Sequence, residues 1–394
     1  MVGNVYGLRL LREPRVRTSG VIVVAAVLGL ARLYQFTYVS IYRLGYDFAY
    51  YWVAAKELLA GQPIYSAQQL AGPYAPQGQQ GFLYPPPLAA LVTPLANFVP
   101  DLAAAVLMWA YLGAAIATIA ILRLAQLERL PERFPLLAGR GFVLLLVGAF
   151  ALPEVIDELV NGNVHLFLLG LFALAWAGVR RGDARGERVA GLAMGVAAVI
   201  KIFPAVMVLW FLLTGRPRAA LWSVVGAVAL ALVTVPITGL QPWLDYPRVL
   251  ANLSAPTDVT ASFAPTIWLA PFVGFAIARI LVTAAGLGIV AWSARYNDTR
   301  SSFAVTVLVS VIITPALWSH YLSIIVVPLL LALSGGVSLV LLGIDYVLLS
   351  AGYQPALGDL GWITTRGMPT LGALLLLGAF LTLPRTRATK AVPA

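Results

Sequence analysis

The stretch AGLAMGVAAVIKIFPAVMVLWFLL, residues 190–213, is almost wholly apolar and holds one charged residue, Lys201. Apolar runs of roughly 15 to 25 residues, near the length that a helix needs to cross a bilayer, recur from residue 20 to residue 384. Only 11% of the residues are charged and 60% are hydrophobic, whereas about one quarter of a soluble domain is charged. The chain is therefore predicted to be an all-α polytopic integral membrane protein.

The apolar runs predict about 12 transmembrane helices. The candidate spans are 20–41, 102–122, 141–153, 162–179, 189–201, 203–213, 219–236, 265–292, 302–316, 320–334, 337–350 and 369–384. They run through the chain without a domain-sized polar insertion, so residues 1–394 are expected to form one transmembrane domain. Within the fifth span, GLAMG (191–195) has the small-xxx-small spacing of closely packed membrane helices, which predicts a packing role.

Basic residues are distributed unevenly between the segments that join these spans. If the N-terminus is cytoplasmic, 19 of the 26 basic residues lie in the inside segments 1–19, 123–140, 180–188, 214–218, 293–301 and 385–394. Lys and Arg concentrate in cytoplasmic loops. Both termini, including the basic tail 385–394, are therefore predicted to be cytoplasmic in a multi-pass cell-membrane protein. This topology also explains the net charge of +10, so no nucleic-acid partner is expected.

The first extracytoplasmic segment, residues 42–101, contains LYPPPLAALVTPLANFVP (83–100). Its three consecutive prolines, together with Pro94, disfavour an uninterrupted membrane helix. We expect a juxtamembrane helix that lies at the interface, or one that dips into the membrane and returns. Non-helical backbone at that depth has to be buried in protein or line a wet cavity.

Costly polar groups near membrane depth gather on the outer side in this topology. These groups are Asp47 after the first span, Glu154, Asp157 and Glu158 after the third, Lys201 at the end of the fifth, and His320 between the ninth and tenth. Ionisable residues at such places are usually functional or paired. The pattern predicts a cavity that is open to the outer leaflet and walled by several helices.

The residue types in this cavity suit the transfer of a sugar from a lipid phosphate to a hydroxyl group. A single carboxylate, Asp47, could act as a general base, and its aromatic neighbours could hold a sugar by their faces and edges. A cation or an imidazole could stabilise a phosphate leaving group. The chain has no cysteine and only two histidines, so no metal site and no obligatory cofactor are expected.

Several of these residues also have structural explanations. Asp47 could be the N-cap of the helix that follows it, and Lys201 could reach the interface with its charged end. His165 is more readily explained as a core histidine, whereas His320 is evenly balanced between the two roles. Glu154 and Asp157 could be solvated loop charges.

Five sequence segments resemble the GT-C membrane glycosyltransferases, and most closely their family GT87. GYDFAYYWVAAKELLAGQPIY (45–65) and FLYPPPLAALVTPLA (82–96) are similar to the family's first outside loop. NGNVHLFLLGLFALAW (161–176) resembles the start of a family span, although Gln commonly follows the glycine there. The segment 190–213 is similar to a Lys-x-x-Pro segment, and PALWSHYLSIIVVPLLL (315–331) to a Trp-x-His-Tyr segment.

The resemblance implies a GT-C-like bundle and a polyprenyl-phosphate-mannose donor whose β-linkage is inverted to give an α-linked product. The acceptor would be a glycolipid or glycan, and membrane lipids would surround the protein. By this resemblance Asp47 is the general base and His320 a second catalytic residue beside the donor phosphate or the acceptor. Expected substrate-binding residues are Tyr46, Tyr50, Tyr51, Trp52, Tyr84, Glu154, Asp157, Asn163, Lys201, Trp318 and Tyr321.

Two other classes of protein compete with the transferase hypothesis. One is a polytopic transporter or lipid flippase of envelope-glycan precursors, and the other is a non-catalytic subunit of an envelope-synthesis complex. Transporters often contain inverted repeats with binding residues near the middle of the membrane. Here no similarity between the two halves is evident, and the polar groups collect at one face. The acceptor, the choice between mannose and another sugar, and the oligomeric state do not follow from the sequence.

Overall fold

A computed structural model describes residues 14–74, 81–253, 262–351 and 367–383 of the chain. All regular secondary structure in these ranges is helical, which confirms the all-α prediction. The basic ends of the sequence, 1–13 and 384–394, lie outside the described residues. The longer helices are α2 (Pro14–Arg43), α6 (Leu102–Leu127), α10 (His165–Arg181), α11 (Ala184–Ile200), α13 (Pro217–Thr238) and α16 (Phe275–Tyr296).

Shorter helices complete the bundle between and beside these long ones. They are α8 (Phe142–Phe150), α9 (Pro153–Asn161), α12 (Val206–Leu213), α15 (Pro265–Val273), α17 (Thr299–Ile312), α18 (Val326–Gly335), α19 (Leu339–Ser350) and α21 (Met368–Thr382). Two 3₁₀ helices, η3 (Phe203–Ala205) and η4 (Ser319–Ile325), precede α12 and α18. Helix α17 is the most central element, because every residue from Ser301 to Ile312 is buried.

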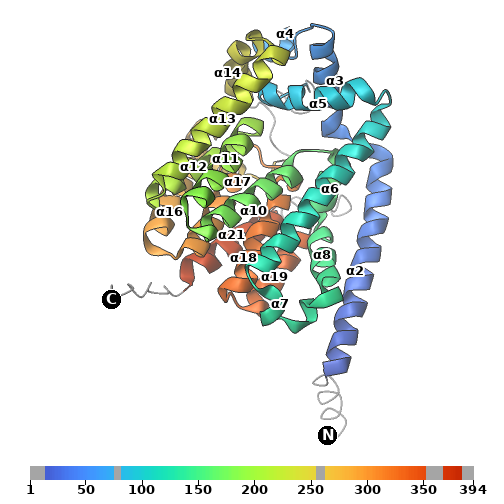
Figure 1. Cartoon of the computed structure of the whole chain (residues 1–394), viewed down its shortest axis with the longest axis vertical. Helices are drawn as coiled ribbons and strands as arrows, with labels where there is room; N and C mark the ends of the chain where they lie inside the picture. The colour runs from blue at the N-terminus through green and yellow to red at the C-terminus, as the bar shows by residue number, and fades with distance from the viewer. Residues whose placement is uncertain (1–13, 75–80, 254–261, 352–366, 384–394) are drawn as a thin grey trace, which may run out of the picture.

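Four helices cap one end of the bundle: α3 (Tyr46–Leu59), α4 (Ala67–Ala71), α5 (Pro86–Phe98) and α14 (Gln241–Leu253). Helix α7 (Leu130–Arg133) lies at the opposite end (Figure 1). The capping helices belong to the segments predicted to lie outside, and α7 belongs to a segment predicted to lie inside. The structure thus groups these loops as the charge-based topology requires, while the side of the membrane that each end faces stays a prediction.

The proline-rich segment forms α5, which packs against α3 and α13. Its second and third consecutive prolines occupy the first turn, where a missing N–H costs no hydrogen bond. Pro94 lies inside the helix, near its C-terminal end at Phe98. A separate helix in this segment agrees with the prediction that residues 83–100 are not an ordinary span.

Three of the described helices, α6, α13 and α16, are long and apolar enough to cross a membrane by themselves. A fourth span results if α9 and α10, which are bent by 120° to one another, are counted together. The first predicted span, 20–41, lies within the 30-residue helix α2, and most of the remaining predicted spans coincide with shorter or broken helices. The predicted span 265–292, for example, breaks at Gly274 into α15 and α16. The structure therefore supports a helical membrane protein, and the total of about 12 spans stays a prediction.

The small residues of GLAMG bring α11 against α13, as their spacing predicts. A Cβ atom on Gly191 would lie 2.3 Å from the carbonyl oxygen of Ala219. A Cβ atom on Gly195 would lie 2.0 Å from the carbonyl oxygen of Ser223. Only glycine permits so close a backbone approach at these two positions. This contact fixes the end of α11, where Lys201 lies.

Candidate active site

Asp47 lies in the first turn of α3, and its carboxylate accepts a hydrogen bond from the amide of Asn163. The N-cap of α3 is Gly45, which has φ 75° and makes no side-chain capping bond. The alternative that Asp47 is merely an N-cap is therefore wrong. The backbone N–H of Gly45 donates to the carbonyl of Val160 at 2.6 Å. This bond ties the start of α3 to the end of α9.

Asn163 comes from the sharp turn between α9 and α10. Gly162 ends α9 with φ 67°, a left-handed conformation that favours glycine. A Cβ atom there would lie 2.9 Å from the Cβ atom of Phe48 in α3. The absence of a side chain at Gly162 lets α3 approach the turn closely enough for Asp47 to reach Asn163.

The amide group of Asn163 is the centre of the candidate site. Its Nδ2 lies 2.8 Å from Oδ2 of Asp47, 2.9 Å from the hydroxyl of Tyr84 and 3.2 Å from Nε2 of His320. The hydroxyl of Tyr84 also lies 3.1 Å from Oδ1 of Asn163. The indole N–H of Trp109 donates to the backbone carbonyl of Asn163 at 3.0 Å and fixes its backbone.

His320 is the second residue of η4 and faces a carboxylate from each ring nitrogen. Its Nε2 lies 3.6 Å from Oδ2 of Asp47, and its Nδ1 lies 3.7 Å from Oδ2 of Asp157. Asp157 also accepts hydrogen bonds from the hydroxyl of Ser319 and, at 3.0 Å, from the amide of Asn161. Asp157 thus orients the imidazole from the side opposite to Asp47. Asp157 is a hydrogen-bonded residue of α9, so the alternative that it is a solvated loop charge is wrong.

Lys201 terminates α11 and turns inward. Its ammonium group lies 2.9 Å from Nε2 of His165 and 3.4 Å from the hydroxyl of Tyr84. It also lies 3.6 Å from the centre of the Tyr321 ring, within the range of a cation–π interaction. Since only 9% of the residue is exposed, Lys201 does not extend its charge into bulk water, and the snorkelling alternative is wrong.

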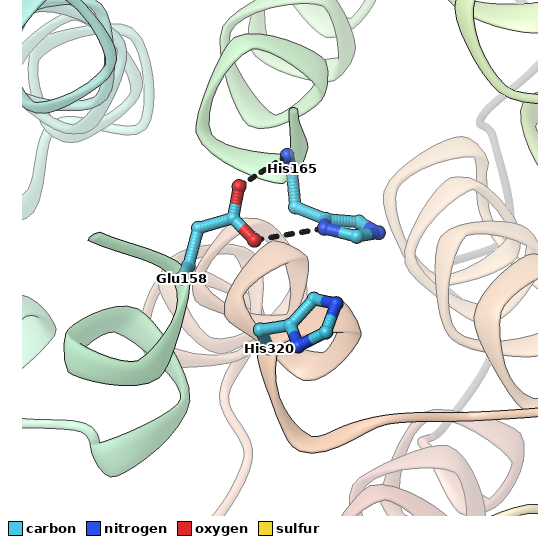
Figure 2. A group of neighbouring side chains, drawn as sticks. All are labelled: Glu158, His165 and His320. Atoms are coloured by element: carbon cyan, nitrogen blue, oxygen red, sulfur yellow. Dashed lines mark hydrogen bonds and ion pairs between the residues drawn. The ribbon is translucent and has the colours of Figure 1, made fainter. Parts of the chain in front are cut away.

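Glu158 and His165 continue this group of side chains into the core, from α9 and α10 on either side of the Asn163 turn (Figure 2). One carboxylate oxygen of Glu158 accepts the backbone N–H of His165 at 2.6 Å, and the other lies 2.9 Å from its Nδ1. Both residues are at most 1% exposed. His165 was expected in the core, whereas Glu158 was expected only as one of the polar groups of the cavity. A carboxylate and a histidine that flank an Asn-Gly-Asn turn are the sequence signal for their contact.

Binding of a metal ion is the alternative chemical role for this part of the site. Glu158, His165 and His320 each offer a ligand atom, and these atoms lie within 4.8 Å of one another. The ammonium of Lys201, however, needs an unprotonated Nε2 on His165. A cation on Nδ1 would require the tautomer with Nε2–H, which places a donor against the ammonium. The side chains therefore fit a hydrogen-bonded chain better than they fit a metal ion.

The aromatic residues of α3 divide between the site and its surroundings. Tyr51 is fully buried, with its ring centre 4.9 Å from that of Tyr84 in an edge-to-face contact. Tyr46 is 45% exposed and makes an edge-to-face pair with Tyr50 at 6.0 Å. Trp52 packs against Phe48, with their ring centres 6.2 Å apart, so its ring serves the packing of α3.

Two other predicted substrate-binding residues lie at the edges of this group. Trp318 is half-buried at the start of η4, one residue before Ser319. Glu154 is buried in the first turn of α9, and its Oε2 has no hydrogen-bond partner among the described residues. The alternative of a solvated loop charge is thus wrong for Glu154 as well.

The phenol of Tyr84 acts as a neutral hydrogen-bonding group. Burial raises the pKa of Tyr84 well above its usual range, and the negative charge of Asp47 adds to this effect. Burial likewise raises the pKa of Tyr51. Because Tyr84 keeps its proton, it can accept from Lys201 and donate to Oδ1 of Asn163 at once.

The fold and the site together define a helical membrane protein with a polar site beneath the helices that cap one end of its bundle. The sequence profile of glycosyltransferase family 87 matches residues 82–315, more than half of the chain. The chain therefore belongs to glycosyltransferase family 87 and is a glycosyltransferase. No curated protein matches its sequence.

Proposed function

We propose that the protein transfers a sugar from a polyprenyl phosphate to a hydroxyl group of a glycolipid or glycan on the extracytoplasmic face. Mannose is the proposed sugar, because it is the usual sugar of the resembling transferases. Asp47 is the general base, and His320 and Lys201 face the phosphate of the donor. The rings of Tyr84 and Tyr321, which lie around these residues, contact the sugar.

The observation that carries this proposal is the position of Asp47 beside both an amide group and an imidazole. Its Oδ2 is held by the amide of Asn163 at 2.8 Å and lies 3.6 Å from Nε2 of His320. Its side chain keeps 22% of its exposure, so a hydroxyl group can still approach it. A carboxylate that is fixed but accessible has the geometry of a general base.

The proposed reaction is a single displacement at the anomeric carbon. The acceptor hydroxyl gives its proton to Asp47 while its oxygen forms a bond to the anomeric carbon. The bond from that carbon to the phosphate oxygen breaks, and its electron pair leaves with the polyprenyl phosphate. Lys201 and His320 stabilise the charge that develops on the phosphate. Attack from the face opposite the phosphate would convert a β-linked donor into an α-linked product.

The proposal is tested by incubating the purified protein with polyprenyl-phosphate-mannose and a panel of hydroxyl acceptors. Products are identified by mass spectrometry. We expect wild-type protein to form a mannosylated product and Asp47→Asn to form none, with donor binding largely retained. Asp101→Asn is the matched control, because Asp101 is an exposed aspartate that caps α6.

Two results would contradict the proposal. If Asp47→Asn transferred the sugar as fast as wild-type protein, Asp47 would not be the general base. If proteoliposomes moved a lipid-linked sugar across the bilayer without consuming it, the transporter hypothesis would replace the transferase.

A further inference from the structure

We propose that Glu158 and His165 are positioning residues, which hold the ammonium group of Lys201 toward the phosphate of the lipid donor. The inference rests on the proposed function, since it concerns how the same site binds that phosphate. Glu158 and His165 themselves lie too deep to touch the substrate, because both are at most 1% exposed. They act through Lys201, which retains 9% exposure.

A continuous chain of polar contacts links Glu158 to Lys201. Oε2 of Glu158 lies 2.9 Å from Nδ1 of His165, and Nε2 of the same ring lies 2.9 Å from Nζ of Lys201. The three groups come from α9, α10 and the end of α11. Each link has the length of a normal hydrogen bond.

The direction of these hydrogen bonds follows from the chemistry of the groups. An ammonium group can only donate, so Nε2 of His165 has to accept from Lys201. The neutral ring then carries its proton on Nδ1, which donates to the carboxylate of Glu158. Glu158 thus selects the one tautomer that presents an acceptor to Lys201. A carboxylate commonly fixes the tautomer of a functional histidine in this way.

An imidazole between the two charges preserves the positive charge that faces the substrate. A carboxylate in direct contact with Lys201 would neutralise the ammonium and compete with a phosphate. The neutral ring separates them and still anchors the side chain. A second N–H of Lys201 is within reach of the hydroxyl of Tyr84 at 3.4 Å. The ammonium also lies against the Tyr321 ring, and its third N–H is the one proposed to donate to a phosphate oxygen.

A binding measurement with citronellyl phosphate, a short polyprenyl-type phosphate, tests this arrangement. Citronellol, which lacks the phosphate, is the reference ligand. We expect wild-type protein to bind the phosphate tightly and the alcohol weakly. Glu158→Gln should weaken phosphate binding about tenfold and leave alcohol binding unchanged, because hydrogen bonds to charged groups are the strong ones.

A second readout separates positioning from a general structural role. Without Glu158 the ammonium is less well stabilised and loses its proton more easily. Phosphate binding by Glu158→Gln should therefore disappear at a lower pH than in wild-type protein. The other titratable groups around Lys201 stay in place in this comparison: Asp47, Tyr84, His165, His320 and Tyr321.

A double-mutant cycle with Lys201→Met completes the test. If Glu158 acts through Lys201, adding Glu158→Gln to Lys201→Met should cause no further loss of phosphate binding. His165→Gln enters the same cycle as an independent variant, and it replaces Glu158→Gln if that protein is not monodisperse.

Each contrary outcome has a separate meaning. Equal binding and equal pH profiles for wild-type protein and the folded variant overturn the positioning role alone. An equal loss in the Lys201→Met background assigns Glu158 to the structure of the core. Loss of binding on chelation, reversed by a divalent cation, assigns the three side chains in Figure 2 to a metal ion instead. If wild-type protein fails to distinguish the phosphate from the alcohol, the proposed function itself fails.

Discussion

The amide nitrogen of Asn163 lies 2.8 Å from the carboxylate of Asp47, although 116 residues separate them in the sequence. The contact joins the first turn of α3 to the turn between α9 and α10. Two glycines with positive φ, Gly45 and Gly162, permit this approach. The same amide also lies 3.2 Å from His320, so a single neutral side chain connects the proposed base to the proposed phosphate-facing imidazole.

Asn163→Ala should reduce turnover more than it reduces donor binding. The substitution removes the hydrogen bond that orients Asp47 and leaves Lys201 in place. We expect kcat for sugar transfer to fall about 10- to 100-fold, the size of a lost hydrogen bond to a charged group. Asn252→Ala is the control, because Asn252 hydrogen-bonds the carbonyl of Gln69 near the same end of the protein. An unchanged kcat in Asn163→Ala would show that Asp47 needs no such support.

Tyr84→Phe should interrupt the connection between Lys201 and Asn163 without disturbing the fold. The ring and its contact with Tyr51 remain, and only the hydroxyl is lost. We expect transfer to fall about tenfold. Since burial raises the pKa of Tyr84 well above its usual range, the phenol stays protonated. The ratio of wild-type to variant rates should thus be constant between about pH 6 and pH 9.

The matched control for this prediction is Tyr246→Phe. Tyr246 belongs to α14, and its ring centre lies 6.1 Å from that of Tyr65. Its pKa is also raised by burial. A ratio that fell toward one as the pH rose would mean that Tyr84 loses its proton in this range.

Gly162→Ala should destabilise the protein and inactivate it. A non-glycine residue in the left-handed region costs roughly 1 to 2 kcal/mol. The new methyl group would also approach Phe48, whose Cβ lies 2.9 Å from the position of the added atom. Gly215→Ala is a close control, because Gly215 has φ 72° with no atom within 4 Å of the added Cβ.

The two alanine variants are compared by thermal unfolding and by sugar transfer. Both variants should be less stable than wild-type protein because of the strained backbone. Only Gly162→Ala should lose activity, because only this substitution separates α3 from the Asn163 turn. Equal activity of the two variants would show that the close approach of Gly162 to Phe48 is not needed for activity.

Glu128→Gln should lower the stability of the opposite end of the bundle without altering KM for the donor. The buried carboxylate accepts from Trp176 at 2.9 Å and Ser334 at 2.7 Å, and it pairs with Arg300 at 2.8 Å. We expect the free energy of unfolding to fall by about 2 kcal/mol. This is less than for a fully buried ion pair, because water can reach Arg300. Arg300 is 29% exposed.

Thermal unfolding in detergent measures this effect, with Glu132→Gln as its control. Glu132 pairs with Arg129 at 4.0 Å, but both side chains are more than 70% exposed. Exposed pairs contribute little, so this variant should unfold as the wild-type protein does. Equal unfolding temperatures of the two variants would contradict the role assigned to Glu128.

The sequence by itself determined the class of the protein and most of its helices. Apolar length, glycine spacing and consecutive prolines act over neighbouring residues, so α11, α13 and α5 could be predicted from them. Asp47, His320, Lys201 and Asn163 could likewise be proposed, because their types suit the chemistry and their segments resemble those of family GT87.

Only the tertiary structure decided which of these polar groups meet. The contact between Asn163 and His320 spans 157 residues, and no local pattern encodes it. Sequence placed Glu158 among the polar groups of the cavity but did not connect it to His165, because a histidine in an apolar run is ordinarily a core residue. Their role depends on Lys201, which the close packing of α11 against α13 brings to the same place. Hydrogen bonds need partners within about 3 Å, and the packing of helices distant in sequence supplies them.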